Sequence, residues 1–205
     1  MKIYVASNNN SKLRRMKKIF SVINPNIIVE RVPEIIDADE NGRDVLKNSL
    51  QKVLPYKDKY DCPVIAGDTA VFFDGETFDP TRVKRICLEG TDVSKLTQQE
   101  IGERMKNFYI NLARKYGGRK EFYFEDGWSV LFPEGEIKQT MYKREYTLTD
   151  KLQGELDIYF PLRSLYIVKG TGKNIYEQTE EEWEKEFAPQ IEAFRGLFKK
   201  YNKNI

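Results

Sequence analysis

Apolar runs and amphipathic segments alternate over the first seventy residues, and this alternation limits the fold more than any other feature of the chain. Apolar runs at 3–6, 27–32 and 63–66 predict strands. Apolar residues at helical spacing predict helices over 12–22 and 45–59. Because strands that alternate with helices are typical of an α/β core, we predict the α/β fold class.

The second half of the chain has a different pattern. A longer amphipathic helix is predicted over 97–116. Residues 121–168 then carry aromatic and β-branched residues in short runs, separated by turn signals such as Asp126-Gly127, which predicts a second lobe of antiparallel strands. A charged amphipathic helix is predicted over 180–201, and Pro189 is expected to interrupt it.

Composition excludes several classes of function. The 34 basic and 32 acidic residues nearly cancel, so we expect no nucleic-acid partner and no membrane partner. The absence of histidine excludes histidine-based catalytic triads and histidine-ligated zinc. Hydrolysis would therefore depend on carboxylates, lysines and a metal bound by oxygen. We expect a single cytoplasmic domain over 1–205, with the second lobe at approximately 121–168.

A polar turn follows the first predicted strand and leads into a helix. The turn contains Ser7, Asn8 and Asn9, and Lys12 lies at the opening of the helix. Backbone N–H groups, amide donors and a positive helix end suit a phosphate chain, so this turn is a candidate triphosphate site. The alternative is a plain hydrophilic turn in which Ser7 and Asn8 cap the helix.

Asp68 follows an apolar strand, where a half-shielded carboxylate needs a cation or several donors. Glu40 and Asp68 could together hold Mg²⁺, because magnesium is bound by one or two carboxylates and by substrate phosphate oxygens. The alternatives are that Asp68 caps the following turn and that Glu40 is a solvated surface residue. Phe160 and the basic turn before Lys173 are weaker candidates, since such residues also occur in cores and hairpins.

Four separate pieces of the chain together resemble the inosine triphosphate pyrophosphatase family, which hydrolyses non-standard purine nucleoside triphosphates to the monophosphate and pyrophosphate. The pieces agree with the family motifs in order and spacing: Ser7–Lys12; Glu40-Asn41-Gly42 with Asn48, Ser49 and Lys52; Gly67-Asp68-Thr69-Ala70; and Gly172–Glu177. The resemblance implies an elongated mixed sheet with two lobes around a central cleft, a possible homodimer and a magnesium-dependent reaction.

The resemblance also assigns roles to individual residues. Glu40 and Asp68 would bind the metal, and Asp68 would also orient or deprotonate the attacking water. Lys12 would act with Asp68 in catalysis. The remaining substrate-binding residues implied by the resemblance are Ser7, Asn8, Asn9, Lys52, Thr69, Phe160, Arg163 and Lys173.

The chain departs from the family pattern at several positions. Arg15 replaces a glutamate, Gly67 replaces the first of two aspartates, and Arg163 stands where an aspartate is expected. Phe187-Ala188-Pro189 falls on the Ser-His-Arg triplet that reads the purine. We therefore predict an altered base specificity, with Arg163 donating to carbonyl oxygens of a different base. The alternatives are a catalytically weak module that binds a nucleotide or a partner protein, and an RNA-binding protein.

Overall fold

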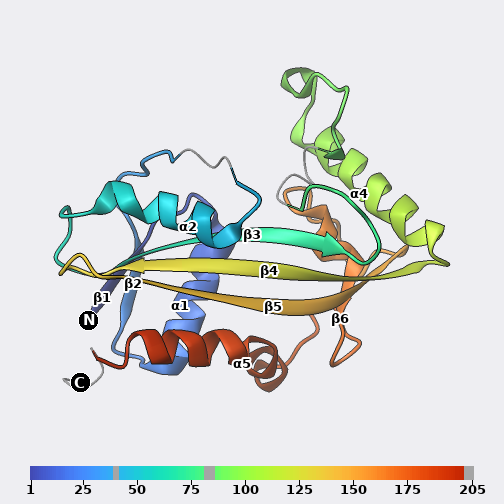
Figure 1. Ribbon diagram of the computed structural model, residues 1–205. Coiled ribbons are helices and arrows are strands. Elements are labelled where there is room, and N and C mark those ends of the chain that lie inside the picture. The colour runs from blue at the N-terminus through green and yellow to red at the C-terminus, as the bar shows by residue number, and fades with distance from the viewer. Residues whose placement is uncertain (39–41, 81–85, 201–205) are drawn as a thin grey trace. The chain divides into compact units, whose positions relative to one another are not determined.

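The computed structural model describes residues 1–38, 42–80 and 86–200 of the chain (Figure 1). Strands and helices alternate at the start of the chain, as the sequence predicts. The elements are β1 (Lys2–Val5), α1 (Asn10–Ile23), β2 (Ile28–Arg31), α2 (Val45–Val53), β3 (Val64–Phe73), α4 (Gln98–Lys115), β4 (Arg119–Leu131), β5 (Ile137–Thr149), β6 (Tyr166–Val168) and α5 (Glu180–Leu197). Short 3₁₀ helices lie at Leu54–Tyr56, Val93–Lys95 and Pro161–Leu165.

The described strands form one sheet in the order β2-β1-β3-β4-β5-β6. β1 is parallel to both of its neighbours, and Val5 pairs with Arg31 of β2 and with Ile65 of β3. β5 and β6 are antiparallel, with Thr147 opposite Ile167. The sheet is therefore mixed, which confirms the predicted α/β class. Along the described part of the chain, no helix combines the length and the apolar character needed to cross a membrane.

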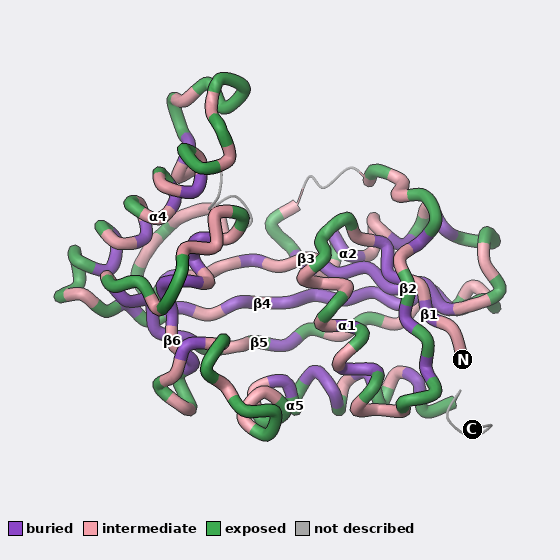
Figure 2. The backbone as a smooth tube through the Cα atoms, turned by 180° about the vertical axis from the view of Figure 1, so that it is seen from behind, coloured by how far each residue is buried: buried purple, intermediate pink, exposed green. Residues whose placement is uncertain are grey.

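The chain forms two compact units. Unit 1 comprises Met1–Thr69, Glu125–Tyr142 and Phe187–Ile205, and unit 2 comprises Ala70–Phe124 and Lys143–Glu186, as far as these ranges are described. β3, β4 and β5 each contribute residues to both units. In Figure 2, buried residues run along the strands and exposed residues gather on the turns and outer helix faces.

Unit 1 has apolar layers on both faces of its part of the sheet. α2 covers one face, and α1 and the C-terminal part of α5 cover the other (Figure 1). Under α2, Val53 and Tyr56 pack with strand residues such as Val64 and Ala66. On the opposite face, Phe20 of α1 packs with aromatic residues in or just after α5 and β4. The ring pairs are Phe20–Phe194, Phe20–Phe198, Trp128–Phe194 and Phe132–Phe198.

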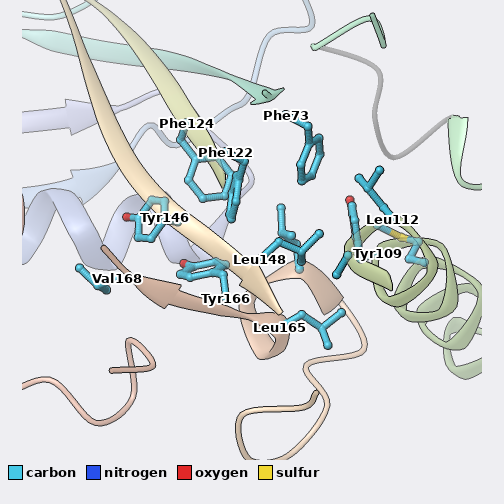
Figure 3. Packing of buried hydrophobic residues seen from close by; sticks show 13 residues of the cluster. Phe73, Tyr109, Leu112, Phe122, Phe124, Tyr146, Leu148, Leu165, Tyr166 and Val168 are labelled. Atoms are coloured by element: carbon cyan, nitrogen blue, oxygen red, sulfur yellow. The ribbon is translucent and has the colours of Figure 1, made fainter. Parts of the chain in front are cut away.

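Unit 2 has its own core of aromatic and aliphatic side chains (Figure 3). Tyr109 and Leu112 project from α4 toward rings of the sheet, which include Phe73 and Phe122. Phe73 and Phe122 are stacked with their centroids 5.2 Å apart. This burial explains the concentration of aromatic residues that the sequence shows after position 120, because each aromatic side chain buries a large apolar area.

Three local predictions were wrong, and so was one of the alternatives. Asp126-Gly127 is not a turn and lies inside β4, and Pro189 lies inside a continuous α5. The helix predicted over 45–59 ends at Val53 and continues only as the 3₁₀ turn Leu54–Tyr56. Ser7 and Asn8 do not cap α1, because the N-cap is Asn9.

Candidate active site

The polar turn after β1 is held by its own side chains. Asn9 Oδ1 accepts hydrogen bonds from the backbone N–H groups of Ser11 (2.8 Å) and Lys12 (3.2 Å), which is the geometry of a helix N-cap. Ser7 Oγ accepts from the backbone N–H of Asn9 at 3.2 Å. Asn8 is exposed, and its carbonyl accepts from Arg31 Nη2 at 3.3 Å. The predicted triphosphate turn is therefore preorganised at the N-terminus of α1.

Lys12 extends from α1 to the end of the apolar part of β3. Its Nζ donates to the carbonyl oxygen of Gly67 at 2.7 Å. The pKa of Lys12 is lowered from 10.5 to about 8, mainly by burial and next by the nearby charge of Lys52. Asp68 and Asp126 act in the opposite direction, and Arg15 again lowers the pKa. At neutral pH this lysine is therefore a protonated, partly desolvated cation.

Asp68 lies on the side of β3 that faces α2, and two residues of that helix bind its carboxylate. Lys52 Nζ donates to Oδ1 at 3.0 Å, and Asn48 Nδ2 donates to Oδ2 at 2.8 Å. The side chains of Lys52 and Asp68 are only 18% and 13% exposed. Burial alone would raise the pKa of Asp68, but Lys52, the Asn48 hydrogen bond and Lys12 outweigh it and hold the pKa below 3.8. Asp68 is therefore a carboxylate at neutral pH.

The donor set around Asp68 fits a hard cation. Asn48 is 2% exposed, and its Oδ1 is a buried acceptor beside the Asp68 carboxylate that has no hydrogen-bond partner among the described residues. Oxygen ligands of this kind are those that magnesium prefers. Glu40, the second predicted metal ligand, lies outside the described residues. Within the described ranges no group of three or more Asp, Glu, His or Cys side chains could hold a metal ion.

A buried carboxylate that sequence reasoning missed lies on the other face of β3. The Asp126 side chain of β4 has no exposed area. Its Oδ1 accepts from Thr69 Oγ1 at 2.6 Å and from Arg15 Nη2 at 3.1 Å. The signal that could have found Asp126 is its place in the alternating buried series of Phe122, Phe124 and Trp128, which a turn would interrupt.

Gly67 lies against the indole of Trp128. A Cβ atom at position 67 would lie 2.6 Å from Cε3 of Trp128, a distance that carbon atoms do not adopt without displacement. Trp128 is fully buried, and the Arg15 guanidinium lies over its ring at 5.3 Å. Position 67 therefore has no room for a side chain while Trp128 lies beside it.

Comparisons with known proteins agree on one family. The Ham1 family model matches residues 3–139, which is more than half of the chain. The chain belongs to the Ham1 family. It is also 24% identical over 197 residues to the dITP/XTP pyrophosphatase of Aquifex aeolicus, a match that covers 89% of this chain and 88% of the relative.

Solved structures of Ham1 proteins have the same fold. The Ham1 protein of Staphylococcus aureus has 20% identity and a TM-score of 0.62, with 95% of this chain and 97% of that chain covered. A HAM1 protein from Coxiella burnetii has 15% identity and a TM-score of 0.65, with 98% and 99% covered. Both likenesses extend over nearly the whole chain, which confirms the predicted fold family.

Three of the predicted Ham1 substrate-binding residues lie in unit 2. Phe160 packs at the edge of the unit 2 core, and the Arg163 guanidinium lies 5.3 Å from its ring centroid. Arg163 also donates to Asp157 Oδ2 at 2.9 Å. Lys173 forms an ion pair with Glu182 at 2.7 Å. Phe160 and Arg163 therefore lie together, whereas the Lys173 amine is held by α5.

The predicted site residues of unit 1 form a group of their own. Lys12 binds the carbonyl oxygen of Gly67 and Lys52 binds the carboxylate of Asp68, so both amines lie at neighbouring residues of β3. Thr69 follows them and is bound to Asp126. Ser7, Asn8 and Asn9 form the turn that leads into the helix that carries Lys12. Unit 1 thus holds the cations, amides and carboxylate that a polyphosphate and a divalent cation would require.

Proposed function

We propose that this protein hydrolyses a nucleoside triphosphate to the monophosphate and pyrophosphate, in a magnesium-dependent reaction with an altered base preference. The observation that carries the proposal is the group formed by Asp68, Lys52 and Lys12 at the end of the apolar part of β3. The activity agrees with the printed name of the Aquifex aeolicus relative, dITP/XTP pyrophosphatase.

The two lysines neutralise the triphosphate in this proposal. Lys52 already pairs with Asp68, and Lys12 is held by a carbonyl oxygen, which is a weaker acceptor than an anion. A phosphate oxygen that replaces the Gly67 carbonyl gives Lys12 a charged partner. Such cations act most strongly where charge develops, as water attacks the α-phosphorus and the bond to the leaving pyrophosphate breaks.

Asp68 orients the attacking water and holds the cation in this scheme. Its lowered pKa favours the ionised form, so it is a good ligand and hydrogen-bond acceptor but a weak base at neutral pH. A magnesium ion at Asp68, with Glu40 as the second predicted carboxylate, would supply Lewis-acid stabilisation of the phosphate charge. Asp68 thus contributes more by orienting the attacking water than by removing its proton.

A nucleotide panel tests this function. Pyrophosphate release is measured with magnesium over standard and modified nucleoside triphosphates, first for the wild type and then for Asp68→Asn. We expect Asp68→Asn to lower kcat roughly 100-fold or more, the usual scale for loss of one electrostatic group in an active site. Asp61→Asn, an exposed aspartate of the same unit, is the control and should retain full activity. Equal rates for wild type and Asp68→Asn would refute the role of Asp68.

The altered base preference is supported by the residues at two positions where the chain departs from the family pattern. Asp157 binds the Arg163 guanidinium, and Phe187, at the place of the family's Ser-His-Arg triplet, is buried. These residues do not reproduce the usual purine-reading groups. We expect inosine and xanthosine triphosphates to lose their usual preference, and Arg163→Met to change the ranking of bases more than the rate for the best one.

A catalytically weak nucleotide-binding or protein-interaction module is the second candidate. Gly67 provides no acid at the first aspartate position, and this observation favours the module. A nucleotide that binds the folded state raises its melting temperature even without turnover. A thermal shift with no pyrophosphate release from any nucleotide would therefore select this candidate.

Assembly and location are also proposals. A homodimer follows from the family resemblance, and light scattering after size-exclusion chromatography tests it. A cytoplasmic location is supported by the two cysteines, which are thiols rather than a disulfide and suit a reducing compartment. The lack of a nucleic-acid partner is supported by the near balance of 34 basic and 32 acidic residues. Salt-dependent binding to single-stranded RNA would contradict the latter.

A further inference from the structure

We propose that Asp126 is a positioning residue of the phosphate site, acting through Thr69 and Arg15. The inference rests on the proposed function and extends it to a strand, β4, that contributes no predicted site residue to unit 1. Three elements of unit 1 meet at this carboxylate: α1 through Arg15, β3 through Thr69, and β4 itself.

Burial shows that Asp126 needs its partners. Its side chain has no exposed area, and an isolated buried carboxylate is strongly destabilising unless it is paired. Arg15 Nη2 and Nη1 donate to Oδ1 at 3.1 Å and to Oδ2 at 3.4 Å, so the pair is bidentate. The Arg15 side chain is 14% exposed. The central carbon of its guanidinium lies 5.3 Å from the ring centroid of Trp128 and 5.9 Å from that of Phe187. Both charges are therefore fixed in one geometry.

The pair fixes the helix that carries Lys12. Arg15 lies three residues after Lys12, which places both side chains on the same side of α1. Lys12 reaches Gly67 of β3 while Arg15 reaches Asp126 of β4. Because α1 is attached at both points, loss of the Asp126 contact frees the helix end that presents Lys12 to a phosphate.

Asp126 also determines the direction in which the Thr69 hydroxyl donates its hydrogen bond. A carboxylate only accepts hydrogen bonds, so at 2.6 Å the Thr69 hydroxyl must be the donor. Its oxygen then presents only lone pairs to the rest of its surroundings. Thr69 can accept from a sugar hydroxyl or a bound water, but it cannot donate to an anionic phosphate oxygen. The expected role of Thr69 in substrate binding is thereby narrowed to that of an acceptor.

The decisive experiment separates positioning from stability. Replacing a buried ion pair by apolar residues of similar volume is often neutral or stabilising, whereas removing one partner is strongly destabilising. The double variant Arg15→Met/Asp126→Leu also removes the buried Arg15 Nε, which has no hydrogen-bond partner in the described part of the chain. We expect this variant to melt at or above the wild-type temperature while its kcat falls at least tenfold with a smaller change in KM.

Thr69 supplies the second measurement. Thr69→Ser keeps the hydroxyl that donates to Asp126 and should retain most of the activity, whereas Thr69→Val should lower kcat severalfold. The control Lys115→Met/Glu76→Leu removes the 2.9 Å ion pair of Lys115 and Glu76, which lies in unit 2, and should leave kcat unchanged. If the Arg15/Asp126 double variant does not fold, the comparison of Thr69→Val with Thr69→Ser decides.

The possible outcomes have distinct meanings. A folded Arg15/Asp126 double variant with kcat within twofold of the wild type overturns the proposal, as does a fully active Thr69→Val. A wild type that hydrolyses no nucleotide refutes the proposed activity instead. In that case the readout is the affinity for a non-hydrolysable nucleoside triphosphate with magnesium. A tenfold weaker affinity of the double variant supports the positioning role, and an equal affinity overturns it.

Discussion

Replacing Lys12 by methionine should abolish activity and at the same time remove a source of instability. Methionine keeps the length of the unbranched side chain but carries no charge. The native state holds the Lys12 ammonium in a partly desolvated place, as the fall of its pKa from 10.5 to about 8 indicates. The same charge that a polyphosphate would need is therefore unfavourable in the unliganded fold.

The magnitude follows from linkage. A pKa that falls from 10.5 to about 8 corresponds to roughly 3 kcal/mol, at about 1.4 kcal/mol per pH unit. The substitution also removes the hydrogen bond to the Gly67 carbonyl, which offsets about 1–3 kcal/mol of this gain. At pH 7 the free energy of unfolding of Lys12→Met should therefore equal or exceed that of the wild type by up to about 2 kcal/mol.

The sign of the pH dependence is the sharper test. Between pH 8 and 10.5 the unfolded chain keeps the Lys12 proton that the folded chain has released, so wild-type stability gains from rising pH in this window. The advantage of Lys12→Met should shrink by roughly 2–3 kcal/mol between pH 7 and pH 10.

Urea unfolding of both proteins at several pH values from 7 to 10, with turnover measured in parallel, provides the assay. Lys17→Met, an exposed lysine of the same helix, is the matched control and should track the wild type. A difference between Lys12→Met and wild type that stays constant with pH would show that the charge of Lys12 is not the cause. Retained activity would remove Lys12 from the site.

Three further outcomes test the packing and the caps. Gly67→Ala should lower the free energy of unfolding by about 1–3 kcal/mol, because its Cβ would overlap the Trp128 ring; adding Trp128→Phe should recover part of the loss in urea unfolding. Glu186→Gln should lower it by roughly 3 kcal/mol, since it removes the negative charge that lies 3.8 Å from the largely buried Arg144 guanidinium, and calorimetry at neutral pH should show the loss. Thr97→Ala should lower the melting temperature through loss of about 1 kcal/mol of capping while kcat stays unchanged.

Periodicity predicted the elements around the site because each strand and helix of that region buries one regular face. The helix predicted over 97–116 was found as α4 in the same way, and the capping box of Thr97 and Glu100 that begins it depends on local residues alone. The prediction of a turn at Asp126-Gly127 was wrong because the turn preference of this pair is local, whereas the contacts of Asp126 with Arg15 and Thr69 are long-range. The sequence gives no direct sign that a residue of α1 and one of β4 will meet.

The grouping of Lys12, Lys52 and Asp68 is a different case. The carboxyl ends of neighbouring parallel strands meet at one edge, so a polar residue after β1 and one late in the apolar run of β3 could be expected to converge. The hydrogen-bond partner of each side chain could not be predicted. That Lys12 would bind a carbonyl and that Asn48 would hold Asp68 depends on side-chain packing, which periodicity does not report.

The contact between Gly67 and Trp128 constrains how this protein can change over time. An acidic residue cannot enter position 67 while the indole fills the adjacent space, so its introduction would have to follow a smaller side chain at position 128. The volume of the Trp128 side chain thus determines the order of the two substitutions, whatever their effect on catalysis. Descendants of this chain would sooner change their chemistry at other positions than gain a second aspartate on β3.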